Sequence, residues 1–169
     1  MGWSESVFAV LKDAAVRQVP YLPDAGLSRL IELAGADANM RLLPLTTEEE
    51  GLGLVTGAWL GGQRSALLMQ SSGVGNCINA MGMIVTCRIP LLMLVTMRGE
   101  WGEANPWQVP MGQATPAVLS AMGLRCLRLD RAEEAAETLQ AAAVLAFESA
   151  VPVAVLVGQR LIGGKRFAE

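Results

Sequence analysis

Three glutamates stand directly before a glycine-rich apolar segment, and they are Glu48, Glu49 and Glu50. Neighbouring residues of a helix point about 100° apart, so only one of the three carboxylates can face a given partner. Glycines four residues apart follow at positions 53, 57 and 61, each at a helix-propensity cost of ~1 kcal/mol relative to alanine. A helix face of this kind, bare of side chains, lets another backbone approach closely. A carboxylate at the edge of such a contact would lose water, which raises its pKa. The pattern fits an acid–base carboxyl group, or a capped helix whose acidic first turn complements its dipole.

The second polar segment is Gln70-Ser71-Ser72-Gly73-Val74-Gly75-Asn76. It lacks the Gly-Lys-Ser/Thr ending of a Walker A loop and the third glycine of GxGxxG. We expect a loop here, because Gly73 and Gly75 allow positive φ and Asn76 can cap a following helix. The loop would serve either as an anion-binding nest or as a tight turn with serine and asparagine caps.

The third segment is long and polar, covering residues 97–113, whereas strand-to-helix connections usually have 2–6 residues. Arg98 lies at the end of an apolar run, where its guanidinium can hold an anionic substrate group with two hydrogen bonds. Trp101 and Trp107 are equally typical of a loop at a subunit interface. Both interpretations stay open on the residues alone.

Composition excludes several classes of function. The sequence contains no histidine, which rules out a Ser-His-Asp triad or a histidine-based metal site within it, and we expect no metal ligands. The net charge of −3 does not attract nucleic acid. Residues 65–87 contain no charged side chain, but serine, asparagine and glutamine interrupt them, so we expect no membrane span. The three cysteines form no CxxC pair, which favours a reducing cytoplasm.

Apolar runs alternate with helical patterns along the chain. We expect strands over residues 18–22, 41–45, 66–70, 91–96, 124–129 and 153–157. We expect helices over residues 4–17 (capped by Ser4), 25–35 (capped by Asp24), 48–60, 76–87, 115–122 and 132–148. This order predicts an α/β fold: a doubly wound, six-stranded, mostly parallel sheet with helices on both faces. Ligands bind at the carboxyl ends of such strands, which places function near residues 22–24, 46–50, 70–76 and 97–108.

Taken in order, these segments resemble the thiamine diphosphate-dependent sulfopyruvate and phosphonopyruvate decarboxylases, in particular the separate α subunit of the former. The matching stretches are YLPDAG at 21–26, the Glu48 helix up to Trp59, ALLMQSSGVGNCIN at 66–79, and residues 97–115. The resemblance covers nearly the whole chain. It implies that residues 1–169 form one pyrimidine-binding domain with the sheet described above.

The resemblance also implies a set of site residues. The activating glutamate of such enzymes stands three before a small residue and nine before a glycine, which selects Glu48 with Gly51 and Gly57; Glu49 would give Leu52 and Ala58. Glu48 would share a proton with the cofactor's aminopyrimidine and thereby activate it. The cofactor-binding set is Glu48, Gln70, Ser72, Gly73 and Asn76, and the substrate-binding set is Asp24, Asn76, Arg98 and Gln108.

The reaction implied is decarboxylation of sulfopyruvate or phosphonopyruvate to the corresponding aldehyde. No Gly-Asp-Gly motif occurs, so the diphosphate-binding domain and its Mg²⁺ are expected on a separate β subunit. The apolar fraction of 52% favours a homo-oligomer within that assembly. Without histidine, proton transfer would fall to Asp24, a water, the cofactor's amine or the partner.

Two alternative functions stay open. One is a carboligase or decarboxylase of another small 2-oxo acid, and the other is a non-catalytic anion-binding or regulatory domain.

Overall fold

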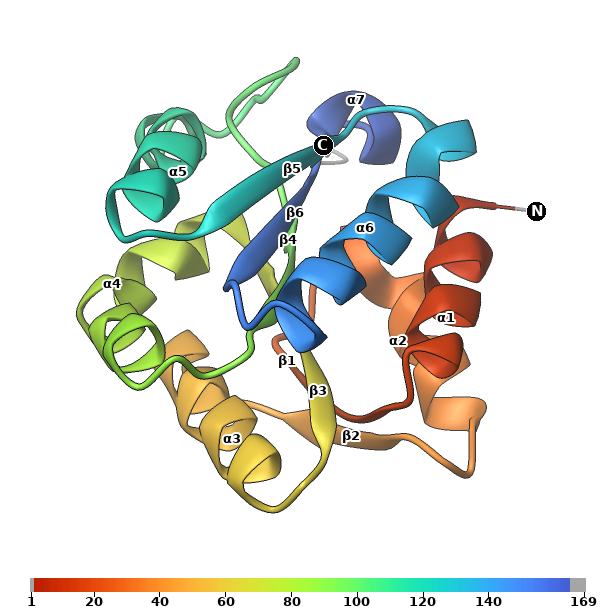
Figure 1. The fold of residues 1–169 in the computed structure, drawn as a ribbon. Coiled ribbons are helices and arrows are strands. Elements are labelled where there is room, and N and C mark those ends of the chain that lie inside the picture. The colour runs from red at the N-terminus through yellow and green to blue at the C-terminus, as the bar shows by residue number, and fades with distance from the viewer. Residues whose placement is uncertain (1, 165–169) are drawn as a thin grey trace.

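A six-stranded parallel sheet with helices on both faces organises the computed structural model, which describes residues 2–164 (Figure 1). The strand order is β2-β1-β3-β4-β6-β5. The strands are β1 Val16–Tyr21, β2 Arg41–Pro44, β3 Arg64–Gln70, β4 Leu92–Thr96, β5 Arg125–Leu129 and β6 Val153–Val157. The helices are α1 Trp3–Asp13, α2 Ser28–Ala36, α3 Glu48–Leu60, α4 Ser71–Thr86, α5 Gln108–Ala121, α6 Ala135–Phe147 and α7 Gln159–Ile162, with 3₁₀ turns at Ala25–Leu27 and Ala132–Glu134. The predicted fold class is confirmed.

The central strands lack a polar face because helices cover the sheet on both sides. Every residue of β4 and of β6 is buried, and so are the five residues 65–69 of β3. The edge strands differ, since Arg41 of β2 and both Arg125 and Arg128 of β5 are exposed. Charged side chains on an edge strand discourage unwanted pairing with another sheet.

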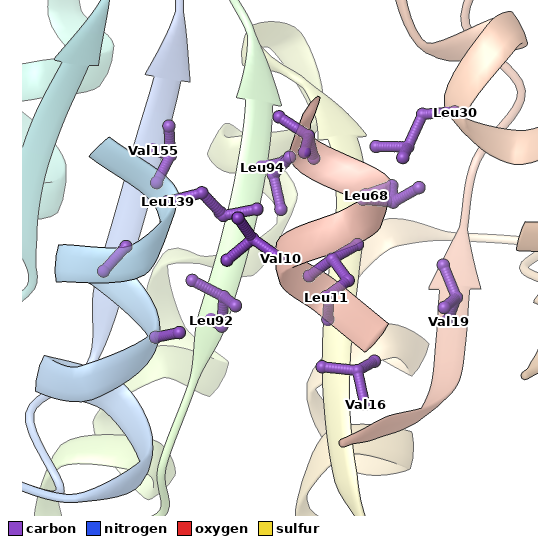
Figure 2. Close-up of a cluster of buried hydrophobic side chains, with 14 of the residues drawn as sticks. Val10, Leu11, Val16, Val19, Leu30, Leu68, Leu92, Leu94, Leu139 and Val155 are labelled. Atoms are coloured by element: carbon purple, nitrogen blue, oxygen red, sulfur yellow. The ribbon is translucent and has the colours of Figure 1, made fainter. Parts of the chain in front are cut away.

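The helices form two layers. Helices α1, α2 and α6 cover one face, and α3, α4 and α5 cover the other (Figure 1). On the first face, Val10 of α1 and Leu139 of α6 pack with Leu92 and Leu94 of β4 (Figure 2). Each fully buried leucine or valine contributes about 1.5–3 kcal/mol to folding. Among the described residues, no helix is both long and apolar enough to cross a bilayer.

The topology fixes where a ligand fits. The chain leaves β1 toward the β2 edge and then returns to the other side of β1 with β3, so the strand order reverses between β1 and β3. In open α/β sheets the crevice at that reversal binds ligands at the carboxyl ends of the strands. Residues 22–24 follow β1 and residues 71–76 follow β3, so two of the predicted polar segments flank this point.

The first helix is shorter than predicted. Helix α1 ends at Asp13 instead of residue 17, because Ala15 takes a left-handed φ of 56° and Val16 begins β1. Its N-cap is Gly2, and Ser4 lies buried inside the helix. The prediction that Ser4 caps this helix is therefore wrong. Asp24 does cap its turn, since its side chain accepts a hydrogen bond from the backbone N–H of Gly26.

The segment after β3 is helical from its first residue. Helix α4 begins at Ser71, so the predicted loop over 71–75, whether nest or turn, is wrong, and Asn76 lies inside the helix rather than capping it. Neither Gly73 nor Gly75 has positive φ. Helix α5 begins at Gln108 instead of residue 115. Pro110 is tolerated in its first turn, where backbone N–H groups have no partner within the helix. The short helix α7 had no sequence signal that we recognised.

Candidate active site

Glu48 is the first residue of α3, and its side chain lies against the first turns of α4. The Nδ2 group of Asn76 donates a hydrogen bond of 2.8 Å to Oε2 of Glu48. A Cβ added to Gly73 would overlap the carboxyl group of Glu48. The absence of a side chain at position 73 therefore allows this close approach, and the backbone there has an ordinary negative φ. The Glu48 side chain is half-buried.

The three adjacent glutamates have three different environments. Glu49 is exposed. The Oε2 atom of Glu50 accepts hydrogen bonds from the backbone N–H groups of Thr46, at 2.8 Å, and Thr47, at 3.4 Å, and forms a capping box with Thr47. The expectation that only one of them can face a given partner is confirmed. The capping interpretation of this segment is right for Glu50, and Glu48 is free of that role.

A second carboxyl group lies where β1 ends. Asp24 is 7% exposed, and its Oδ2 accepts hydrogen bonds from Gly26 N–H at 2.9 Å and from Thr96 Oγ1 at 3.0 Å. Its Oδ1 has no hydrogen-bond partner among the described residues. One oxygen of this carboxyl group is thus fixed by the protein, and the other is buried and free.

Gln108, the first residue of α5, has the same property. Its Oε1 atom is buried without a hydrogen-bond partner in the part of the chain that the structure describes. A buried acceptor left without a donor costs about 1–3 kcal/mol. Asp24 and Gln108 were both predicted to bind substrate, and the structure leaves in each an acceptor suited to a hydrogen-bond donor from a ligand or water.

Arg98 is buried in a forked ion pair. Its Nε and one terminal nitrogen donate to the two carboxyl oxygens of Glu103, at 2.9 and 3.2 Å, and the exposed fractions of the two side chains are 5% and 1%. Hydrogen bonding to this guanidinium lowers the pKa of Glu103 to about 2. The role of Arg98 in binding a substrate anion stays a prediction, and in this structure its charge is already balanced.

The remaining predicted residues lie at the start of α4. Gln70 is its N-cap residue and Ser72 lies in its first turn, both half-buried. The structure brings Glu48, Gly73 and Asn76 into contact, and no hydrogen bond joins these three residues to Asp24, Arg98 or Gln108.

Sequence reasoning missed three polar residues that support the site. Ser71 accepts a hydrogen bond of 3.1 Å from the backbone N–H of Arg98, Thr96 binds Asp24, and the buried Gln159 binds the loop after β4. Thr96 closes an apolar strand and Ser71 follows one, which is a signal that sequence reading could use. Gln159 carried none.

Comparison with known proteins identifies the family. Residues 28–164 match the family model described as pyruvate flavodoxin/ferredoxin oxidoreductase, thiamine diphosphate-binding. The chain is 37% identical over 158 residues to the sulfopyruvate decarboxylase subunit alpha of Methanococcus maripaludis, covering 93% of this chain and 95% of the relative. It is 33% identical to the sulfopyruvate decarboxylase of Methanosarcina acetivorans, covering 93% of this chain and 40% of that longer relative. It is 34% identical to the phosphonopyruvate decarboxylase of Streptomyces viridochromogenes, covering 66% and 28%.

A solved structure has the same fold. The 2-oxoglutarate:ferredoxin oxidoreductase from Magnetococcus marinus, with 2-oxoglutarate, coenzyme A and succinyl-CoA bound, superposes with a TM-score of 0.78 at 14% identity, covering 96% of this chain and 29% of that chain. At that identity the likeness concerns the fold. The sequence matches show more than the fold: the chain contains the thiamine diphosphate-binding domain of the family model, and it belongs to the family of sulfopyruvate decarboxylase α subunits.

Proposed function

We propose that this chain is the pyrimidine-binding subunit of a thiamine diphosphate-dependent decarboxylase that acts on sulfopyruvate or phosphonopyruvate. The observation that carries the proposal is the contact of Glu48 with Asn76 and Gly73 across α3 and α4. Family membership supports the cofactor and the reaction class. Glu48 is the group that activates the cofactor.

The residues around Glu48 fit the aminopyrimidine end of the cofactor. Asn76 binds only Oε2, which leaves Oε1 as a site for a hydrogen bond to a ring nitrogen. Gln70, Ser72 and Gly73 would line the same end of α4. When bound, thiamine diphosphate supplies the electron sink for loss of carbon dioxide. Glu48 holds and exchanges the proton at its carboxyl group, while the amide of Asn76 fixes the orientation of that group.

Asp24 is the group that we propose for proton transfer to and from the substrate. The sequence has no histidine for this task, and Asp24 offers a buried carboxyl oxygen, Oδ1, without a partner among the described residues. Thr96 and Gly26 hold the other oxygen, so the free one has a defined direction. The free Oε1 of Gln108 would accept a hydrogen bond from the substrate or a water.

The sulfonate or phosphonate needs a different partner. The free atoms of Asp24 and Gln108 are acceptors, and acceptors repel the oxygens of an anion. Either Arg98 exchanges Glu103 for the substrate anion, or the anion binds a cation of the partner subunit. The KM of an Arg98→Met variant separates these two possibilities.

The partner is a β subunit that supplies the diphosphate site and Mg²⁺. Across residues 2–164 the structure brings together no group of three or more Cys, Asp or Glu side chains able to hold a metal ion. Helix α3 exposes Leu60 at 78%, and a Cβ added to Gly53 or Gly57 would meet no atom within 4 Å. Met83 and Val85 of α4 are each 40% exposed. These exposed apolar side chains and open glycine positions on α3 and α4 support a protein–protein contact on this side of the sheet.

The test of the function is reconstitution. The chain is co-expressed with a β subunit that carries the Gly-Asp-Gly motif, and aldehyde and carbon dioxide are measured with each of the two substrates. We expect turnover that depends on both Mg²⁺ and thiamine diphosphate, and weak or no cofactor binding by the isolated chain in calorimetry. Micromolar binding by the isolated chain would contradict the divided site. Turnover restricted to another 2-oxo acid, or aldehyde ligation, would support the alternative chemistry instead.

The variant Gly57→Leu tests whether the exposed side of α3 is a contact surface. Because position 57 is open in this chain, leucine there should leave the fold intact and block close packing by a partner or by a second copy. Ala141→Leu, at an exposed position of α6 in the opposite layer, is the matched control. Light scattering should show a smaller assembly for Gly57→Leu only. An unchanged assembly would remove this face from the interface.

A further inference from the structure

The loop between β4 and α5, residues 97–107, is bound by a residue far away in the sequence. Gln159, the first residue of α7, is completely buried. Its Oε1 accepts hydrogen bonds from the backbone N–H groups of Glu100, at 3.0 Å, and Trp101, at 2.9 Å. One amide oxygen therefore fixes two successive peptide groups of the loop.

The other end of the same amide binds the buried ion pair. The Nε2 group of Gln159 donates a hydrogen bond of 2.9 Å to Oε2 of Glu103. Glu103 also accepts from the backbone N–H of Asn105 at 3.1 Å and binds Arg98. Gln159 thus connects the middle of the loop to the charged pair at its base.

The base of the loop contacts the elements that carry the site. The backbone N–H of Arg98 binds Ser71, the first residue of α4. The carbonyl group of Arg98 packs so closely on α5 that a Cβ at Gly112 would overlap it. Helix α4 carries the partners of Glu48, and α5 begins with Gln108. A continuous set of contacts therefore runs from Gln159 to both sides of the site.

We propose that Gln159 is a positioning residue, which holds loop 97–107 so that Gln108, directly after this loop, keeps the geometry that the substrate needs. Its effect on turnover rests on the function proposed above, whereas its effect on the loop does not. Hydrogen bonds suit this task because they are directional, so they select one conformation of the loop where an apolar contact would permit several.

The first test removes the amide. In Gln159→Leu the N–H groups of Glu100 and Trp101 lose their acceptor, so their hydrogen exchange should become at least about tenfold faster. In the complex with the β subunit, KM for the substrate should rise about tenfold. The kcat value and C2 hydrogen exchange of the bound cofactor, which report Glu48, should stay within about twofold of wild type. Gln140→Leu, at an exposed glutamine of α6, is the matched control and should change none of these quantities.

The second test is a rescue by pH with Gln159→Glu. A carboxylate at 159 would face the carboxylates of Glu103 and Glu100, while the nearby cations Arg98 and Arg128 are already paired with these two. At pH 7.5 the variant should resemble Gln159→Leu. As pH falls toward 5.5, the new carboxyl group gains a proton before Glu103 does, because the Arg98 guanidinium keeps the pKa of Glu103 below its usual range. The protonated group restores one donor and one acceptor, so KM should return toward that of wild type.

The outcomes are distinct. Unchanged exchange at residues 100 and 101 in Gln159→Leu, or a KM equal to that of wild type, would overturn the proposal. A parallel fall of kcat and C2 exchange would assign Gln159 a general structural role instead, and so would a Gln159→Glu variant that shows no recovery at low pH. If the wild-type complex turns over neither substrate, the proposed function fails, and the exchange measurement still decides whether Gln159 holds the loop.

Discussion

Glu48 and Glu103 are both carboxylates that lie beyond the carboxyl ends of the strands, yet their surroundings are opposite. Glu103 is 1% exposed and binds Arg98, Gln159 and the backbone of Asn105. Glu48 is half-buried, and Asn76 is its hydrogen-bond partner among the described residues. A carboxylate whose oxygens are all occupied is committed to one charge state and one conformation. A carboxylate with a free oxygen is available for chemistry.

The same contrast separates the two roles that sequence reasoning assigned to these regions. It placed chemistry at Glu48 and substrate binding at Arg98. The structure supports an available group at the first place and a closed ion pair at the second. Variants in the two regions should therefore have different effects. Those at Glu103 and Arg98 should change the stability of the fold, and those around Glu48 should change turnover.

The largest effect is expected from Arg98→Met. Removing the guanidinium leaves Glu103 charged and buried without its main partner, which should lower the free energy of unfolding by about 3–5 kcal/mol. Urea denaturation measures this loss. Arg160→Met, at an exposed arginine whose guanidinium lies 3.9 Å from the centre of the Trp101 ring, is the control and should cost about 1 kcal/mol or less. The KM of the assembled complex is the second measurement: a raised KM would assign Arg98 to the substrate anion, and an unchanged KM would assign that anion to a cation of the partner subunit.

The ion pair also predicts how stability depends on pH. The pKa of Glu103 is lowered from 4.5 to about 2 in the folded chain. Its ionised form therefore stabilises the fold above about pH 4.5, and this contribution is lost as pH falls from there toward 2. Urea denaturation between pH 6 and pH 3 should show a steeper loss of stability for wild type than for Glu103→Gln. Parallel curves for the two proteins would contradict the assignment.

Glu48→Gln should lower turnover by ~10²-fold or more, because the amide keeps the size of the side chain but cannot exchange the proton. Hydrogen–deuterium exchange at C2 of the cofactor in the α/β complex measures the step directly. Glu49→Gln, one residue further on the same helix and exposed, is the matched control. If Glu49→Gln loses exchange and Glu48→Gln keeps it, the assignment is wrong by one residue.

Gly73→Ala tests the position of the carboxyl group without changing its chemistry. The added methyl group would overlap the end of the flexible Glu48 side chain, which can move away, so we expect the chain to fold and turnover to fall about tenfold. Gly82→Ala on the same helix is the control, because a Cβ there meets no atom within 4 Å and alanine favours the helix by ~1 kcal/mol. Equal turnover in the two variants would show that Glu48 tolerates displacement.

The smallest effect is expected from Glu50→Ala. This change removes the capping box with Thr47 and one favourable charge at the start of α3, which should cost about 0.3–1 kcal/mol of stability. Turnover per assembled complex should stay close to that of wild type. A large loss of turnover would mean that the cap, and not only Glu48, orients the site.

The strands could be predicted from the sequence because their signal is local. An apolar run bounded by Pro90 and Arg98 predicted β4, and the apolar residues 153–157 predicted β6, each to within one residue. Strand β5 was also predicted to within one residue, although it is an edge strand with exposed arginines at positions 125 and 128. The parallel order then followed from the alternation of strands with helices.

The starts of α4 and α5 could not be predicted, because distant contacts determine them. Gly73 looked like a turn residue, but its small size accommodates Glu48, which lies 25 residues earlier in the chain. Gly112 likewise accommodates the carbonyl group of Arg98. A sequence shows that a glycine is present and does not show which neighbour excludes a side chain there.

The residues of the candidate site also differ in whether local sequence could identify them and their partners. Glu48 could be singled out through the resemblance, which gives the spacing of the activating glutamate to Gly51 and Gly57 within one helix, and its role stays a prediction. The partner of Arg98 could not be predicted, because a substrate anion and Glu103 suit a guanidinium equally well, and the fold of the loop decides between them. Gln159 lies about 60 residues from the peptide groups that it binds, and no local pattern reports such a contact.

The length and rigidity of α3 determine how precisely the carboxyl group of Glu48 is positioned. Its 13 residues span about 18 Å, so the open glycine positions and the carboxyl group of Glu48 belong to one rigid rod. A tilt of about 5° around the far end of such a rod displaces its first residue by about 1.5 Å, and a misplacement of about 1 Å can slow a reaction ~10²-fold. If a partner packs against α3, the accuracy of that packing would therefore set the catalytic rate. An inaccurately packed assembly would have low turnover, while its choice of substrate would stay the same.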